Sequence, residues 1–516
     1  MKRLNTQSGK NVIFSGGGAM VNPILQLVAV PILFKRLGAE DFGIWALINA
    51  VIASSGIANL GLGDAATKYV AKHRARSEAS RVISIIRSIF LLYLVLGAMA
   101  AAVVWLAAHW IALHGFKAKS DHLTLAVTSL RIAAVGIVIR FAYGVMESTV
   151  RGYDRYDIES VWGTSNAVIT TLLAVVCAMS GAGLNVILLV GITVQAVSFA
   201  GLAGAVRRLA QTWRFLEPGF DRASMKEVFS FGVFTWLQTL NGIVLQQLDR
   251  LVIGASVGAV AVGYYSVCLQ LVQTAQTVLS RASAFVFPLI VRYNEEGRKE
   301  QLWDLFKQGM ILTTVTGWIM SGGIFVFGGN FLALWMGPAF AQRATFPLQI
   351  LSVWTAFLAT SILIFYFLNA TGNERLNTLL SASSSFSFLV AGICLIPAFG
   401  VVGAAWARLL SFLPALVGVG MVFRRCFNER RWYVSILILI PTTVAVFETM
   451  LLHNSRMIYT TGDFFLKIII FGIACISCAA ACCLVYLKVL ARPLEPALQK
   501  ILIEQQLTEC PAVRKS

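Results

Sequence analysis

Long apolar blocks joined by short polar connections are the feature that most constrains the fold of this chain. A helix rises about 1.5 Å per residue, so about 20 apolar residues cross the ~30 Å hydrocarbon core of a bilayer. We count fourteen such blocks, near residues 12–34, 42–63, 82–106, 123–146, 160–181, 184–206, 228–252, 259–287, 303–327, 345–369, 376–397, 400–423, 432–452 and 464–487. The 516-residue chain is 58% hydrophobic and only 13% charged, whereas soluble proteins carry about 25% charged residues. The sequence therefore predicts an all-α polytopic membrane protein with about 14 transmembrane helices.

The basic residues predict how these helices are oriented. If the N-terminus is cytoplasmic, most of the 42 Lys and Arg residues fall in segments on the cytoplasmic side. The positive-inside rule favours this arrangement, which places both termini in the cytoplasm. The net charge of +18 is then a topology signal and a contact with anionic headgroups. We therefore expect no nucleic-acid partner, and no sequence motif indicates a cofactor, a metal site or a catalytic residue.

An internal repeat relates two parts of the sequence at an offset of 220 residues. The matching positions are Gly38-Ala39 with Gly258-Ala259, Gly43 with Gly263, Gly152 with Gly372, and Arg155 with Arg375. Six spans per half is an even number, so both halves begin on the same side of the membrane and form a parallel pseudo-twofold repeat. In such bundles the substrate path lies between two lobes that rock against each other. The predicted organisation is an N-terminal lobe at 1–227, a C-terminal lobe at 228–431, two accessory spans at 432–493 and a cytoplasmic tail at 494–516.

Polar side chains inside the predicted spans are the candidates for a substrate site, because ionisable groups at membrane depth are costly unless they face water or a partner. Arg281 is the sharpest candidate. Gln270, Thr274 and Thr277 precede it by eleven, seven and four residues, which puts all four on one helical face. A guanidinium group can bind a phosphate through two parallel hydrogen bonds. The stripe predicts a water-filled lumen for an anionic head group; the alternative is an Arg281 side chain that extends to the cytoplasmic surface.

Further polar residues extend this set. The other candidate lumen residues are Asn22, Gln26, Asn59, Asn241, Arg131 and Arg140. Arg131 and Arg140 are nine residues apart, so at most one of them is expected to face a central cavity. The candidate gating or ion-coupling residues are Asp249, Arg250, Asp64 and Glu448. Asp249 and Arg250 are either a coupling pair or an interfacial charge pair, and the pattern leaves the role of Arg408 open.

Motifs in both halves carry a family resemblance. They are Pro31-Ile-Leu-Phe-Lys-Arg-Leu-Gly38, Phe42-Gly43, Asn59-Leu-Gly-Leu-Gly63, Leu248-Asp249-Arg250-Leu-Val-Ile-Gly254, Val262-Gly263-Tyr264-Tyr265 and Phe287-Pro288. In these segments the chain resembles the polysaccharide-export flippases (O-antigen, or Wzx-type, flippases), whose superfamily also holds multidrug antiporters and the lipid II flippase. The resemblance implies a non-enzymatic transporter of the bacterial inner membrane. It also implies that the protein flips an undecaprenyl-pyrophosphate-linked oligosaccharide, the repeat unit of O-antigen or exopolysaccharide, by alternating access through a cationic lumen.

The expected partners follow from the same resemblance. They are a lipid-linked oligosaccharide as substrate, H⁺ or Na⁺ as a coupling ion, and other membrane proteins of polysaccharide assembly. One alternative function is a cation-coupled multidrug antiporter, which would want an acidic residue in its lumen. The mid-span charges are mainly arginines, which favours an anionic substrate. A second alternative is a membrane glycan polymerase or transferase, for which large outer loops are expected, whereas the outer loops here are short.

Overall fold

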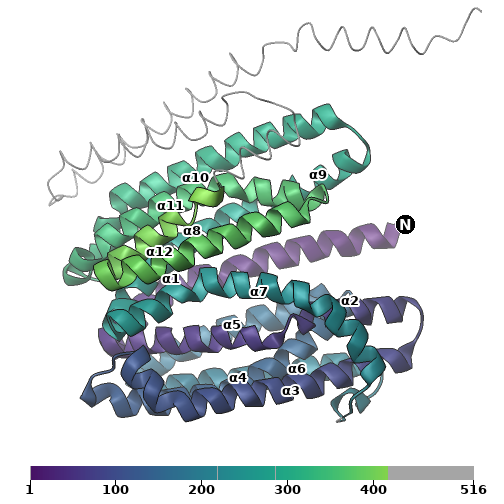
Figure 1. The fold of residues 1–516 in the computed structure, drawn as a ribbon, viewed down its shortest axis with the longest axis horizontal. Helices are drawn as coiled ribbons and strands as arrows, with labels where there is room; N and C mark the ends of the chain where they lie inside the picture. Colours follow the sequence, from purple (N-terminus) through teal and green to yellow (C-terminus); the bar gives the residue numbers. More distant parts are fainter. Residues whose placement is uncertain (1, 218, 285, 416–516) are drawn as a thin grey trace, which may run out of the picture. The chain divides into compact units, whose positions relative to one another are not determined.

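The computed structural model describes residues 2–217, 219–284 and 286–415, and all regular structure in these residues is helical (Figure 1). The elements are α1 (Lys2–Ser54), η1 (Ser55–Asn59), α2 (Leu62–Ala75), α3 (Ala79–Trp110), η2 (Ile111–Gly115), α4 (Ser120–Gly152), α5 (Tyr156–Met179), α6 (Leu184–Ala210), η3 (Arg214–Leu216), α7 (Arg222–Ser256), α8 (Ala259–Ser283), α9 (Val286–Glu295), α10 (Lys299–Trp335), α11 (Pro338–Ala370) and α12 (Glu374–Leu410). The predicted all-α class is confirmed for this part of the chain. The expected accessory spans, the tail and Glu448 lie outside the described residues.

Nine segments of the described chain are long and apolar enough to cross a membrane. Two of them contain a glycine at which the helix breaks, Gly38 in α1 (φ 82°, ψ 168°) and Gly400 in α12 (φ 59°, ψ −131°). Glycine adopts positive φ without the steric penalty that other residues meet. The breaks fall at the predicted boundaries between the first and second spans and between the eleventh and twelfth. The chain is therefore a multi-pass membrane protein, and the total of fourteen spans stays a prediction.

The two repeat halves cross at equivalent small residues. A Cβ atom added at Gly43 would lie 1.9 Å from the carbonyl oxygen of Ala259, and one added at Gly263 would lie 3.0 Å from the carbonyl oxygen of Ala39. Ala259 and Gly263 are the repeat counterparts of Ala39 and Gly43, so the two contacts exchange when the halves are exchanged. This is the pattern of a contact around a two-fold axis. The repeat is thus visible in the backbone at this crossing, while the lobe boundaries stay predictions.

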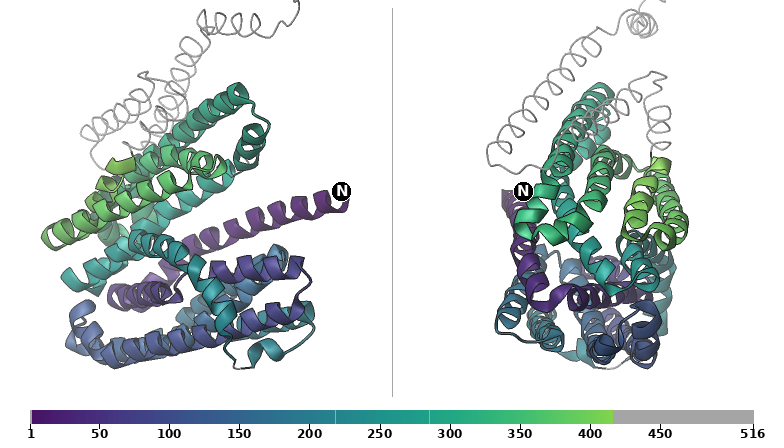
Figure 2. Two further views of the ribbon diagram at one scale, coloured as in Figure 1. Left: turned by 45° about the vertical axis from the view of Figure 1, so that its right-hand side comes forward. Right: turned by 90° about the vertical axis from the view of Figure 1, so that its left-hand side faces the viewer.

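Aromatic contacts and a backbone hydrogen bond join the halves beside the crossing. Phe34 of α1 contacts Tyr264 of α8 and Phe340 of α11, with ring centroids 5.9 and 5.0 Å apart. The Ala259 N–H donates to the carbonyl oxygen of Phe116 at 3.0 Å. The first leg of α1, purple in Figures 1 and 2, runs between blue helices of the first half and green helices of the second. Helix α1 also packs against α5 of the first half and against α7 and α8 of the second.

Candidate functional site

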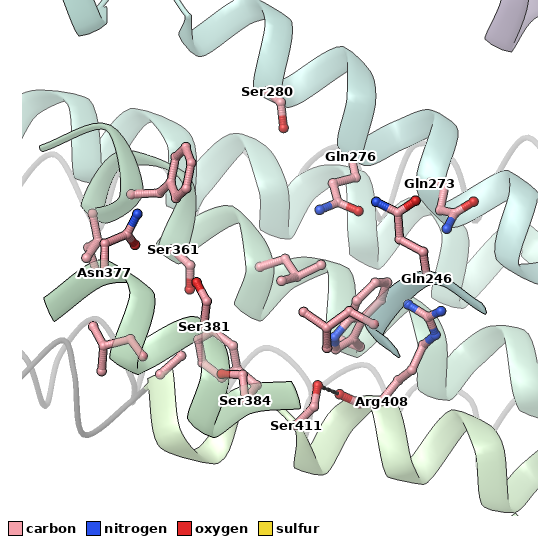
Figure 3. Close-up of a pocket in the computed structure, with 18 of the residues that line it drawn as sticks. Gln246, Gln273, Gln276, Ser280, Ser361, Asn377, Ser381, Ser384, Arg408 and Ser411 are labelled. Carbon is pink, nitrogen blue, oxygen red and sulfur yellow. Dashed lines mark hydrogen bonds between the residues drawn. The ribbon is translucent and has the colours of Figure 1, made fainter. Parts of the chain in front are cut away.

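A cavity of about 740 Å³ lies between α7, α8, α11 and α12 (Figure 3). Its polar lining comprises Gln246, Gln273, Gln276, Thr277, Ser280, Arg281, Ser361, Tyr366, Asn377, Ser381, Ser384, Arg408 and Ser411. Among the lining residues that the structure describes there is no Asp or Glu. All the lining residues come from the second half of the chain, whereas the sequence predicts a substrate path between the halves. The cavity is therefore a cationic and hydrogen-bonding chamber within the second half.

Helix α8 supplies one wall of this chamber. Its lining residues recur at three- and four-residue intervals from Gln273 to Ala284, which is the spacing of one helical face. Eleven residues of helix extend about 16 Å, so this wall runs along much of the length of the cavity. Arg281 is exposed near one end of the wall. Figure 3 shows the side chains of Gln273 and Gln276, which lie nearer the N-terminal end of the same wall, pointing into the cavity.

A buried charge cluster closes the far end of the chamber. Arg408 of α12 is only 4% exposed and Asp249 of α7 is fully buried. The Nε–H of Arg408 lies 2.7 Å from Oδ2 of Asp249 and 2.9 Å from the hydroxyl oxygen of Tyr265 on α8. The Tyr265 hydroxyl in turn donates to the same carboxylate oxygen at 2.5 Å. Three helices are thus joined by one ion pair and its hydrogen bonds.

The Arg408 guanidinium also faces aromatic rings of the chamber. Its central carbon lies 4.9 Å from the ring centroid of Trp354 and 5.4 Å from that of Phe388. Both rings line the cavity, and cations are attracted to the faces of such rings. Figure 3 shows the guanidinium of Arg408 beside Gln246, with Asn377 at the opposite end of the chamber. Arg408 is therefore both an internal ion-pair partner and part of the cavity wall.

The predicted stripe on α8 is only partly in the cavity. Arg281 and Thr277 line it. The Thr274 side chain is buried and its hydroxyl donates to the carbonyl oxygen of Gln270 at 2.8 Å. Neither Thr274 nor Gln270 is among the lining residues, because the open face of α8 is turned toward Gln273 and the residues that follow it at helical spacing.

The candidate lumen residues on α1, η1 and α7 lie away from the cavity lining. The Gln26 Nε2–H donates to Thr171 Oγ1 at 3.1 Å and so ties α1 to α5. Asn22 and Asn59 each have a buried Oδ1 that has no hydrogen-bond partner among the described residues. Asn241 accepts a hydrogen bond from the Ser385 hydroxyl through its backbone carbonyl at 3.4 Å.

The charged candidates are likewise scattered. Arg131 and Arg140 are both exposed on α4, and Arg131 lies 5.7 Å from the ring centroid of Trp105. Asp64 is exposed in the first turn of α2. None of these three residues lines the described cavity.

The pairing of Asp249 differs from the expectation that it pairs with Arg250. Its ion-pair partner is Arg408 on α12, while Nη1 of Arg250 donates to Oε1 of Gln247 at 3.1 Å. Successive residues on a helix point in different directions, so Asp249 and Arg250 do not face each other. Arg408, whose role the sequence left open, lines the cavity, and so do the amides Gln246, Gln273 and Gln276, which the sequence did not single out.

Comparison with known proteins identifies the family. A sequence model of the family described as polysaccharide biosynthesis protein matches residues 8–294, more than half of the chain. The chain belongs to this polysaccharide biosynthesis family. A relative from Shigella flexneri, named as a candidate O-antigen transporter, is 20% identical over 81% of this chain and 98% of its own length. The predicted family resemblance is confirmed, and relatives of this polysaccharide biosynthesis family member carry the names of transporters and flippases.

Solved structures show the fold of this polysaccharide biosynthesis family member. An inward-facing multidrug-resistance transporter of the MATE family, in the MOP superfamily, aligns with a TM-score of 0.65 at 15% identity over 83% of this chain and 98% of that one. The lipid II flippase MurJ, in its inward closed conformation, aligns with a TM-score of 0.63 at 12% identity over 86% and 99%. At these identities the likeness is one of fold, and the function has to be argued from the chamber.

Proposed function

We propose that this protein flips an undecaprenyl-pyrophosphate-linked oligosaccharide, an O-antigen or exopolysaccharide repeat unit, across the bacterial inner membrane. The observation that carries the proposal is the composition of the chamber: two arginines, many neutral donors and no carboxylate among its described lining residues. Pyrophosphate offers only acceptors and negative charge, which arginine binds through paired hydrogen bonds. The names of the relatives support the same substrate class.

The chamber offers separate groups for each part of such a ligand. Arg281 would bind the pyrophosphate, since it is the exposed cation of the lining. The amides of Gln246, Gln273, Gln276 and Asn377 can both donate to and accept from sugar hydroxyls. The polyprenyl chain, which needs no polar partner, would stay in the surrounding lipid. With both termini cytoplasmic, Arg281 lies toward the cytoplasmic end of α8 and would meet the head group first.

A cation-exporting antiporter fits the chamber less well. A lipophilic cation would need a carboxylate that faces the cavity. The nearest carboxylate identified there, Asp249, is fully buried and neutralised by Arg408. Alternating access and coupling to H⁺ or Na⁺ remain part of the proposal for the flippase, as they are for other two-lobed transporters.

Complementation of a strain that lacks its O-antigen flippase tests the proposal, with all variants at matched membrane levels. Wild type and Arg281→Lys should restore surface glycan, the lysine variant less well because it lacks the fork of donors. Arg281→Ala should lower it by at least about tenfold, the effect of losing about 1.4 kcal/mol of binding. Arg140→Ala is the matched control, since Arg140 is an exposed arginine of α4 outside the cavity lining.

A binding experiment with the purified protein tests the proposal even if the glycan of the host strain is not a substrate. Geranylgeranyl pyrophosphate should bind the wild type, and geranylgeraniol, which has the same chain without the charge, should bind far more weakly. Full activity of Arg281→Ala would remove Arg281 from the substrate path. A wild type that neither restores glycan nor distinguishes the two probes would overturn the flippase proposal.

A further inference from the structure

Arg408 has a second role that follows from its two environments. We propose that Arg408 is a reserve anion-binding residue, which Asp249 and Tyr265 hold in the empty transporter and which the entering pyrophosphate takes over from Asp249. The proposal rests on the proposed function, since it concerns the same anionic substrate. It assigns the deep end of the chamber as the second phosphate position, after Arg281.

The geometry allows the exchange. Asp249 is behind Arg408 and does not line the cavity, whereas Arg408 does. Both short contacts of the ion pair, from Nε at 2.7 Å and Nη2 at 2.6 Å, go to the single oxygen Oδ2. This is not the arrangement of two parallel bonds to two oxygens that makes arginine–carboxylate pairs strongest. A pyrophosphate, with more charge and more acceptor oxygens, can compete for the same guanidinium.

Asp249 keeps hydrogen bonds when Arg408 leaves it. Its Oδ2 accepts from the Tyr265 hydroxyl at 2.5 Å, and its Oδ1 accepts from the backbone N–H of Arg250 at 2.9 Å. The charged and titratable groups identified around Asp249 are Tyr265 on α8, Arg408 on α12 and Arg250 on α7 itself. The carboxylate thus keeps one hydrogen-bond donor on each oxygen without Arg408, which offsets part of the cost of leaving it buried without a counter-ion.

The repeat indicates that the fold does not need this charge cluster. The positions 220 residues before Asp249, Tyr265 and Arg408 are Ala29, Trp45 and Leu188. Ala29 and Leu188 are buried at 1% and 7% exposure in the first half. Buried ion pairs are often no more stabilising than apolar residues of similar volume. The first half thus packs apolar residues at these positions, so a buried ion pair is not required there for folding.

Transfer of Arg408 from Asp249 to the ligand would also change the contacts between α7, α8 and α12. Arg408 is the contact through which α12 is bound to Asp249 of α7 and Tyr265 of α8. It lies eight residues after the break at Gly400, on the second leg of α12. Release of Arg408 by the ligand would remove the ion pair and the hydrogen bonds that join this leg to Asp249 of α7 and Tyr265 of α8. Occupancy of the deep phosphate position is thereby linked to movement of the cavity walls.

Binding of geranylgeranyl pyrophosphate to purified full-length variants tests the inference, with geranylgeraniol as the uncharged probe. Asp249→Asn removes the competing carboxylate and should tighten binding of the pyrophosphate by about tenfold, because Arg408 then has no ion pair with residue 249 in any molecule. The double variant Asp249→Asn with Arg408→Gln keeps a neutral hydrogen-bonded pair at the site. It should fold, as judged by gel filtration and thermal melting, and bind the pyrophosphate more weakly than the wild type.

The outcomes separate this inference from the function on which it rests. If the wild type binds the pyrophosphate and Arg281→Gln weakens it, while Asp249→Asn changes nothing and the double variant binds like the wild type, the cluster is structural and the inference fails alone. If the wild type does not prefer the pyrophosphate over the alcohol, the proposed function fails and the inference with it. Tighter binding of the pyrophosphate but not of the alcohol to Asp249→Asn, with loss in the double variant, supports the reserve role.

Discussion

The close crossing of the two halves makes Gly43→Ala a sharp test of the fold. The added Cβ would lie 1.9 Å from the carbonyl oxygen and 2.5 Å from the carbonyl carbon of Ala259. Ordinary contact begins at 3.4 Å, so α1 and α8 would have to separate by about 1.5 Å. Both clashing atoms belong to the backbone, so no side chain can rotate to relieve the contact.

The expected loss follows from these distances. Overpacking of a tight contact costs about 3 kcal/mol when nothing can move aside. The exchange of glycine for alanine in a helix returns about 1 kcal/mol, which leaves a net destabilisation of about 2 kcal/mol. Gly263→Ala should cost less, because its Cβ would lie 3.0 Å from the Ala39 oxygen. Gly204→Ala is the matched control, since nothing lies within 4 Å of its added Cβ, and it should be neutral or stabilising.

Denaturant titration of the purified variants in lipid bicelles measures these differences as free energies of unfolding. The expected order of stability is Gly204→Ala, wild type, Gly263→Ala and then Gly43→Ala. The sign of the difference between the first and last variants is the decisive result, because both make the same chemical change in a helix. If Gly43→Ala were as stable as Gly204→Ala, the halves would not cross at this glycine and the reasoning from the repeat would be refuted.

Two further predictions concern the rim of the crossing and a polar loop. Phe340→Ala should lower the free energy of unfolding by about 3–5 kcal/mol, because the Phe340 side chain is only 4% exposed. Phe386→Ala should change it little, because Phe386 is 68% exposed. Equal losses for the two variants in the same denaturant titration would contradict the packing of Phe340 at the crossing. The hydrogen bond with buried His73 lowers the pKa of Glu78, so its contribution to stability is full above the ordinary glutamate pKa and is lost as the pH falls through the lowered value. Thermal melting of the wild type across this acidic range should show a step that Glu78→Gln lacks, and a step of equal size in both proteins would show that another group titrates there.

Helical spacing in the sequence predicts some residues of the cavity and not others. Arg281 and Thr277 were predictable as cavity residues because they share a helical face, and a helical face is a local property of the sequence. Arg408 was not, because its partner Asp249 is 159 residues away in the sequence. Gln26 is a similar case, since its amide is used by Thr171, a contact between two helices that no spacing on α1 predicts.

The sequence by itself determined the helical membrane class, the repeat and the family. These depend on the lengths of apolar blocks and on where glycine permits a helix to break, as at Gly38 and Gly400, and such properties act along the chain. Only the tertiary structure decided which polar residues share a chamber and which charge neutralises Asp249. The physical reason is that a buried charge is stabilised by whichever group packing brings within a few ångströms, and packing joins helices that are far apart in the sequence.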